Sequence, residues 1–182
     1  MVKTYPVPLS KEEVDRIIDA AIEDDYYYMF FMVAKTTGRR LGEYLDVQVK
    51  DIDFSKNIMV TKVQKRKKKV EKEAILSDEV SRLIRQYVSR YELELDDFVF
   101  RKHKRRTIQA KIKHYAKIAG IEKNVMFHNF RHYFITELVR KGWSYDKIAK
   151  LTGHSSVGTL AIYDHAVASD IKQEALEALR SI

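Results

Sequence analysis

The side chains best suited to act on a phosphate group lie in the second half of the chain. The segment from His128 to His132 reads His-Asn-Phe-Arg-His, which places His128 and Arg131 three residues apart and on one face of a helix. An arginine can clamp two phosphate oxygens, and a histidine beside it can donate or accept a proton. We therefore interpret His128 and Arg131 as a phosphate-handling pair, and we expect His132 to be a structural hydrogen-bonding residue.

Metal-based and serine- or cysteine-based chemistry fits these residues less well. His128 and His132 have the i, i+4 spacing of a zinc-binding helix, but the metalloprotease pattern requires a glutamate where this chain has Asn129. The sequence contains no cysteine, which excludes thiolate nucleophiles, thiolate metal sites and disulfides. It also contains neither a G-x-S-x-G motif nor a glycine-rich phosphate loop. We predict no bound metal at this site.

Three further motifs flank the phosphate-handling pair. Upstream, residues 37–43 read Thr-Gly-Arg-Arg-Leu-Gly-Glu; downstream, residues 151–154 read Leu-Thr-Gly-His, and a tyrosine follows at 163. His154 lies 23 residues after Arg131, and Tyr163 lies nine residues after His154. In this order and at these spacings, T-G-x-R-x-x-E, H-x-x-R-H, G-H and Y resemble the signature of the tyrosine recombinases of the phage integrase family. Each motif alone is weak, whereas four in register are specific.

The resemblance covers the chain from about Ser10 to Tyr163, nearly its whole length. It implies that Arg40 and Arg131 hold the non-bridging oxygens of the scissile phosphate and stabilise the charge of the five-coordinate transition state. It also implies that Tyr163 attacks that phosphate, giving a 3′-phosphotyrosine and a free 5′-hydroxyl. The arginines take the place of a metal ion and the phosphotyrosine stores the bond energy, so the resemblance implies neither metal, ATP nor another cofactor.

The remaining catalytic positions follow from the same resemblance. His128 is expected to donate or accept a proton, His154 to hydrogen-bond the phosphate, and Glu43 to orient Arg40. Tyr163 is the only tyrosine with the spacing from the G-H motif that the nucleophile requires, although the chain contains 11 tyrosines.

The lysine that protonates the leaving 5′-oxygen in this family is harder to assign. It lies in a β-hairpin turn, usually beside a glycine, and the turn in this chain has no glycine and several lysines. The candidates are Lys62, Lys65, Lys67, Lys68 and Lys69. Counting from Arg40 favours Lys65, our prediction, whereas counting back from the second strand favours Lys67.

The charge of the chain favours a polyanionic partner. The net charge is +8 and the isoelectric point is near 9.4, and two dense basic runs occupy residues 65–69 and 101–106. We expect double-stranded DNA to be the partner and these runs to contact its phosphate backbone. The predicted DNA-contacting residues are Arg39, Lys67, Lys68, Lys69, Arg101, Lys102, Lys104, Arg105 and Arg106.

Hydrophobic spacing and capping residues predict a mainly α fold with a small antiparallel β-sheet. Ser10, Ser77 and Ser144 are predicted N-caps, and Glu13 completes a capping box with Ser10. Other helices are predicted over Asp25–Thr37, Arg40–Leu45, Thr107–Ala119, Phe127–Lys141, Thr159–Tyr163 and Ser169–Ile182. Two strands are predicted over Ile58–Val63 and Val70–Leu76, joined by a turn at Gln64–Lys69.

We expect residues 1–182 to form one catalytic domain with a tail helix at 169–182. In this family such tails often dock on a neighbouring subunit, so we expect tetramer assembly on DNA through the tail. The family's separate N-terminal DNA-binding domain is missing, which indicates either a fragment of a longer integrase, the interpretation we favour, or a minimal recombinase. No stretch is long and apolar enough to span a membrane, and we expect an intracellular protein. The Lys/Glu-rich composition suggests an archaeal virus or plasmid integrase.

Two other functions are compatible with the motifs. A type IB topoisomerase-like enzyme would share the fold, the arginines and the tyrosine but would relax DNA without strand exchange. A catalytically silent DNA-binding module is the second alternative. The departures from the family pattern are Phe130 where leucine is usual, the glycine-free hairpin and the ambiguous lysine.

Overall fold

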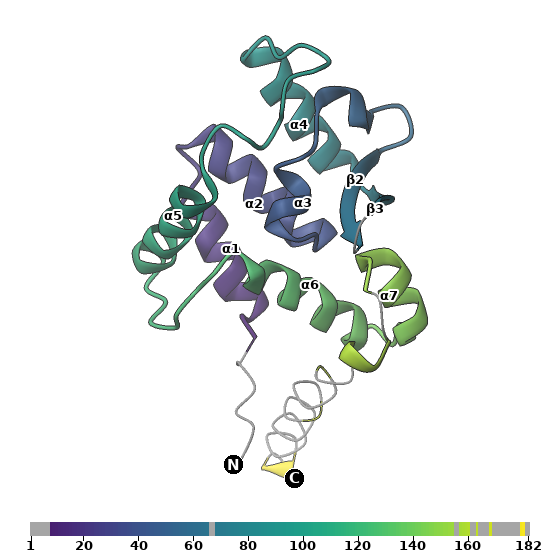
Figure 1. Cartoon of the computed structure of the whole chain (residues 1–182). Helices are drawn as coiled ribbons and strands as arrows, with labels where there is room; N and C mark the ends of the chain where they lie inside the picture. The colour runs from purple at the N-terminus through teal and green to yellow at the C-terminus, as the bar shows by residue number, and fades with distance from the viewer. Residues whose placement is uncertain are drawn as a thin grey trace.

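The computed structural model of this chain is mostly helical with one small antiparallel sheet (Figure 1), which confirms the predicted fold class. The structure describes residues 8–65, 68–154, 157–160, 163, 168 and 179–180; it does not describe the side chains of residues 63–65, 68–69 and 157. The predicted tail helix at 169–182 and most of the predicted helix at 159–163 lie outside the described residues.

The N-terminal helices form the centre of the fold. Ser10 caps α1 (Lys11–Asp19) through the predicted capping box, with its hydroxyl accepting from the Glu13 amide and the Glu13 carboxylate accepting from the Ser10 amide. The next helix, α2 (Asp25–Thr37), is buried on nearly all sides and ends at Gly38, whose φ of 57° is left-handed. The short helix α3 (Leu41–Tyr44) follows directly, so the Thr37–Glu43 motif spans the junction of two helices.

The sheet is larger than the hydrophobic pattern predicted. Strands β2 (Ile58–Lys65) and β3 (Lys68–Ile75) pair antiparallel over their whole length, and a short β1 (Ile52–Asp53), which was not predicted, pairs with the start of β2. The predicted turn at Gln64–Lys69 was wrong at four of its six positions, because Gln64 pairs with Lys69 and Lys65 with Lys68. Backbone pairing between two strands needs no apolar side chains, so a pattern of hydrophobic residues could not reveal strand ends that consist of lysine and glutamine.

The other helices lie close to their predicted positions. Ser77 caps α4 (Asp78–Arg90); α5 (Arg105–Ile118), α6 (His128–Arg140) and α7 (Tyr145–Thr152) follow, and a 3₁₀ helix covers Val157–Leu160. Ser144 is the N-cap residue of α7 without a side-chain cap bond, and Gly153 ends α7 in a left-handed conformation. Within the described residues, no helix is long and apolar enough to cross a membrane.

Helix α6 joins two hydrophobic clusters and thereby positions the chemistry. Near its start, Phe130 and Tyr133 pack into the main core around α2, whereas Ile135 and Leu138 pack with α7 in a second cluster that also contains Tyr163. In Figure 1, α6 accordingly crosses beneath α2 and reaches α7. Arg131 and His132 lie between Phe130 and Tyr133, yet they also contact the second cluster's side of the molecule, because Arg131 bonds the ends of both α2 and α7 and His132 bonds Tyr163.

Candidate active site

Arg131 lies at the centre of the site, and its guanidinium is held by backbone carbonyls. The side chain is 1% exposed. Its Nη1 donates to the Gly38 carbonyl at 2.8 Å and to the Thr152 carbonyl at 2.9 Å. Both oxygens belong to helix C-termini, since Gly38 caps α2 and Thr152 is the last residue of α7. The free carbonyls of a helix end carry partial negative charge, so two helix ends stabilise this buried cation.

This arrangement orients Arg131 without neutralising it. Burial is the main cause that lowers the pKa of Arg131, to about 10, and the positive charge of Arg40 lowers it further. The group therefore remains cationic at neutral pH. Because the helix-end carbonyls carry only partial charges, most of the positive charge remains available to an incoming phosphate.

His154 contacts Arg131 and is oriented by Thr152. The imidazole nitrogens lie 3.0 Å (Nε2) and 3.1 Å (Nδ1) from Arg131 Nη2. The buried Thr152 hydroxyl donates to the Ile148 carbonyl at 2.6 Å and lies 2.6 Å from His154 Nδ1. Since that hydroxyl has only one proton, we assign the second bond to donation from His154 Nδ1–H. Burial, followed by the charge of Arg131, lowers the pKa of His154 to about 4, which keeps the imidazole neutral.

Tyr163 packs into the α6–α7 cluster, with its hydroxyl on His132. The tyrosine is 6% exposed, and its Oη lies 2.7 Å from His132 Nδ1. Burial raises the pKa of Tyr163 to about 12, although the charge of Arg131 acts in the opposite direction. Burial, followed by the neighbouring His128 and Arg131, lowers the pKa of His132 to about 4. At neutral pH, therefore, a protonated phenol faces a neutral imidazole.

Arg40 and His128 form the exposed side of the site. Glu43, which is buried, accepts from the Arg40 guanidinium at 2.9 Å and from the Arg40 amide at 3.2 Å, and so fixes both ends of that residue. His128 lies one helical turn before His132, and their rings meet edge to face at 4.5 Å. Desolvation by surrounding atoms, followed by Arg131 and Arg40, lowers the pKa of His128. Arg40 and His128 are both exposed, so a group that enters the site from solvent contacts these two residues first.

The predicted residues from distant parts of the chain thus come together. Arg40 comes from α3, His128 and Arg131 from α6, His154 from the end of α7, and Tyr163 from the segment that follows. Charge interactions join Arg131 to each of the other four. Among the described residues, no group of three histidine, cysteine or acidic side chains is arranged to hold a metal ion. Independence from metal remains a prediction.

The lysine assignment stays a prediction. Lys65 ends β2 and pairs with Lys68 of β3, but neither side chain is described, and Lys67 lies outside the described residues. Lys62 is partly buried and pairs with Asp51 at 3.4 Å, so a carboxylate already holds its ammonium group.

Two of the residues predicted to contact DNA have their guanidinium groups turned onto the protein. Arg39 is 1% exposed and donates from Nη2 to the Glu73 carbonyl, while its Nε and Nη1 are buried without a hydrogen-bond partner. A DNA contact by Arg39 would require it to leave this site. Arg101 donates to the Leu45 carbonyl at 2.9 Å and to Asp46 at 2.8 Å.

The other predicted contacts of the second basic run are exposed, and one of them, Arg105, approaches the site. Lys102, Lys104, Arg105 and Arg106 are exposed, and the last three surround the N-terminus of α5. Arg105 reaches α3, because a Cβ added to Gly42 would lie 2.4 Å from Arg105 Nη2. Gly42 sits between Arg40 and Glu43, so the absence of its side chain lets Arg105 approach the exposed side of the site.

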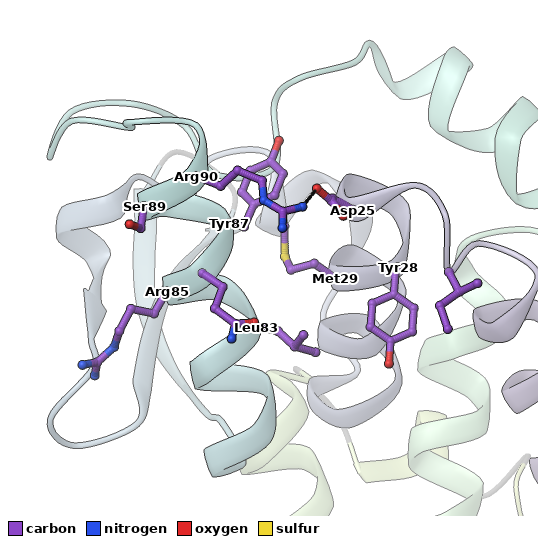
Figure 2. A pocket seen from close by; sticks show the side chains of 10 residues that line it. Asp25, Tyr28, Met29, Leu83, Arg85, Tyr87, Ser89 and Arg90 are labelled. Atoms are coloured by element: carbon purple, nitrogen blue, oxygen red, sulfur yellow. Dashed lines mark hydrogen bonds and ion pairs between the residues drawn. The ribbon is translucent and has the colours of Figure 1, made fainter.

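A cavity elsewhere in the molecule contains none of the predicted site residues. It measures about 870 Å³ and lies between α2 and α4, where Met29 and Leu83 line it (Figure 2). Asp25 and Arg90 form an ion pair at its edge.

Three groups in the site were not assigned there from sequence. His132 was predicted to be structural, but it contacts the Tyr163 hydroxyl. Thr152 and the Gly38 carbonyl belong to the T-G-H and T-G-x-R motifs, yet nothing in those motifs indicates that both bind Arg131 or that Thr152 orients His154. All three lie within the motifs, so membership of a motif is the one signal in the sequence that could have marked them.

Comparison with known proteins places the chain in a family. The pattern that defines the phage integrase family matches residues 8–169. The chain belongs to the phage integrase family. It is similar to the tyrosine recombinase XerA of Saccharolobus solfataricus, at 34% identity over 145 residues, which is 80% of this chain and 47% of that relative. The chain thus spans about half the length of that integrase-family relative.

Solved structures of integrase-family proteins share the fold. A crystal structure of XerA recombinase superposes with a TM-score of 0.78 at 30% identity, covering 96% of this chain and 65% of that one. The catalytic domain of bacteriophage HP1 integrase superposes with a TM-score of 0.69, covering 92% of this chain and 95% of that domain. The second pair is 16% identical and so shows the shared fold alone. The fold is that of a tyrosine recombinase catalytic domain.

Proposed function

We propose that this chain is the catalytic domain of a site-specific DNA recombinase that cleaves and rejoins double-stranded DNA through a 3′-phosphotyrosine bond to Tyr163. The observation that carries the proposal is that Arg40, His128, His154 and Tyr163, from segments far apart in the chain, all lie within the range of charge interactions with Arg131. Two guanidinium groups and two imidazoles suit a phosphodiester, whose transition state gains negative charge. The reaction needs neither a metal ion nor ATP.

In this mechanism the resting hydrogen bonds are exchanged when DNA binds. The scissile phosphate enters from the exposed side and receives donors from Arg40 and Arg131. His154 keeps its Nδ1–H on Thr152, so its Nε2 faces the phosphate. An anion beside that ring raises the pKa of His154, so Nε2 takes up a proton and donates one hydrogen bond to the phosphate while Nδ1–H stays on Thr152. The lysine of the β2–β3 hairpin, predicted to be Lys65, protonates the leaving 5′-oxygen.

The exposed basic residues at the start of α5 supply affinity for the DNA backbone. Lys104, Arg105 and Arg106 are joined there by the positive end of a helix dipole, and the first turn of α5 contains no acidic residue. Contacts of this kind depend steeply on salt and carry little sequence information.

We also propose that residues 1–182 are one catalytic domain within a longer recombinase, and that the tail at 169–182 joins subunits in a tetramer on DNA. The length of the XerA relative supports the first point, and the amphipathic spacing of the tail supports the second.

A suicide DNA substrate tests the proposed chemistry. A pool of duplexes is nicked so that the cleaved strand cannot be rejoined, and the reaction is run in EDTA with the wild-type chain and with Tyr163→Phe. Tyr91→Phe, which changes an exposed tyrosine outside the site, is the matched control. We expect a covalent protein–DNA adduct on denaturing gels with the wild type and Tyr91→Phe, and none with Tyr163→Phe.

Each other outcome contradicts part of the proposal. An adduct that persists in Tyr163→Phe overturns the nucleophile, and one that forms only without EDTA overturns the metal-free mechanism. DNA binding without any adduct supports a silent DNA-binding module. Relaxation of supercoiled DNA without strand exchange supports the topoisomerase-like alternative.

A further inference from the structure

The hydroxyl of Tyr163 has a specific partner, His132, to which the family resemblance assigned no catalytic role. It lies 2.7 Å from His132 Nδ1, a short hydrogen bond for a phenol and an imidazole. A phenol is the better donor and an unprotonated imidazole nitrogen the better acceptor, so we assign the proton to Tyr163 and the other ring proton to His132 Nε2. In the part of the chain that the structure describes, no hydrogen bond joins this hydroxyl to His128.

The surroundings keep His132 ready to accept a proton. It lies on α6 directly after Arg131, and its ring contacts both the His128 ring, at 4.5 Å, and the Tyr163 ring, at 5.6 Å between centroids. Burial, followed by the charges of His128 and Arg131, lowers the pKa of His132 and so disfavours the imidazolium form before DNA binds. A phosphate anion in the same cluster reverses that effect, because it stabilises a positive charge on nearby imidazoles.

We infer that His132 is the group that takes the proton from the nucleophile Tyr163 during DNA cleavage. As the phenolic oxygen forms its bond to phosphorus, the O–H proton moves to His132 Nδ1, and the bond from phosphorus to the 5′-oxygen breaks. The leaving oxygen takes a different proton, from the general acid. In rejoining, the 5′-hydroxyl returns its proton to that acid, and His132 reprotonates the departing phenolate.

The inference rests on the proposed recombinase chemistry and adds a proton-transfer role for His132, which the sequence predicted to be structural. His128, one turn earlier on α6, contacts the phosphate, whereas His132 contacts the attacking atom. His132 is therefore a catalytic residue on the nucleophile side, and the hairpin lysine acts on the leaving-group side.

The test is His132→Asn, because the asparagine amide oxygen can accept the Tyr163 hydrogen bond near the position of Nδ1 but cannot take the proton. Cleavage is followed in single-turnover reactions on a duplex recovered from the wild-type adduct. We expect the cleavage rate to fall by about 100-fold or more, within the range usual for loss of a general base, with DNA affinity unchanged. His114→Asn, at an exposed position on α5, is the matched control and should cleave normally.

A second substrate separates the two ends of the reaction. A sulfur in place of the leaving 5′-oxygen departs as a thiolate without protonation, so it should restore cleavage to a variant of the general acid, predicted to be Lys65. It should not restore His132→Asn. Restoration of His132→Asn would overturn the inference, and so would a normal or faster rate on ordinary DNA.

A measurement on the wild-type chain covers the case in which His132→Asn fails to fold. Nitrogen-15 NMR of the histidine rings should show His132 protonated at Nε2 and unprotonated at Nδ1 at neutral pH. A proton on Nδ1 would refute the assignment, since that nitrogen could not accept. Absence of any wild-type adduct would instead count against the recombinase proposal itself.

Discussion

Gly38→Ala should have two effects at once: it should destabilise the fold, and it should displace the Arg131 side chain. Gly38 has a φ of +57°, and an added Cβ would lie 2.3 Å from Cδ1, 2.8 Å from Cγ and 3.0 Å from Cβ of Phe134. Rotation of the Phe134 ring cannot move the Cβ of Phe134 away from the methyl group added at residue 38, so α6 must shift. Phe134 lies three residues after Arg131, whose Nη1 donates to the Gly38 carbonyl at 2.8 Å.

The size of the effect follows from two contributions. A left-handed backbone costs an alanine roughly 1–2 kcal/mol, and an extra methyl group forced into packed atoms costs about 1–3 kcal/mol. We therefore expect Gly38→Ala to lower the free energy of unfolding by about 2–5 kcal/mol, from the sum of these two terms. For a chain of this length each kcal/mol lowers the melting temperature by about 2–4 °C.

Gly120→Ala separates the two contributions. Gly120 has a φ of +68° and no atom within 4 Å of an added Cβ, so it should show the backbone cost alone. Thermal melting followed by circular dichroism should place Gly38→Ala below Gly120→Ala by roughly 2–12 °C, the packing term converted to temperature. Gly38→Ala should also slow adduct formation, and Gly120→Ala should not. Equal melting temperatures would refute the packing argument, and normal cleavage by Gly38→Ala would refute the role of the Gly38 carbonyl.

Two further predictions concern the electrostatics of the site. Gly42→Ala should stabilise α3 by up to about 1 kcal/mol, which melting curves measure. It should also weaken DNA binding by displacing Arg105, which salt-dependent binding isotherms measure. In a chain that already carries Arg105→Ala, Gly42→Ala should weaken DNA binding no further. Because the pKa values of His132 and His154 fall to about 4 from an ordinary 6.5, the unfolded chain binds more protons between these values. Stability should therefore be lost as pH falls from about 6.5 to about 4, and replacing both histidines with asparagine should flatten melting temperature against pH in that window.

The sequence by itself determined the fold class, most helix boundaries and the candidate catalytic set. These features depend on residues that are close together in the sequence: a serine cap with Glu13 starts α1, a glycine ends α2, and apolar spacing indicates α4. The H-x-x-R spacing alone puts His128 and Arg131 on one helical face. Where the local signal was weak, as in the lysine-rich hairpin, the strand ends were missed and the general acid stayed ambiguous.

Only the tertiary structure decided how those residues are held. The bonds from Arg131 to the C-terminal ends of α2 and α7 join residues 93 and 21 positions away along the chain. The burial of Arg39 against β3 and the contact between His132 and Tyr163 likewise depend on how segments far apart in the chain pack together. Residue spacing cannot predict such contacts, because every residue has a backbone carbonyl whatever its type. The burial of a side chain likewise depends on which distant segments of the chain pack around it.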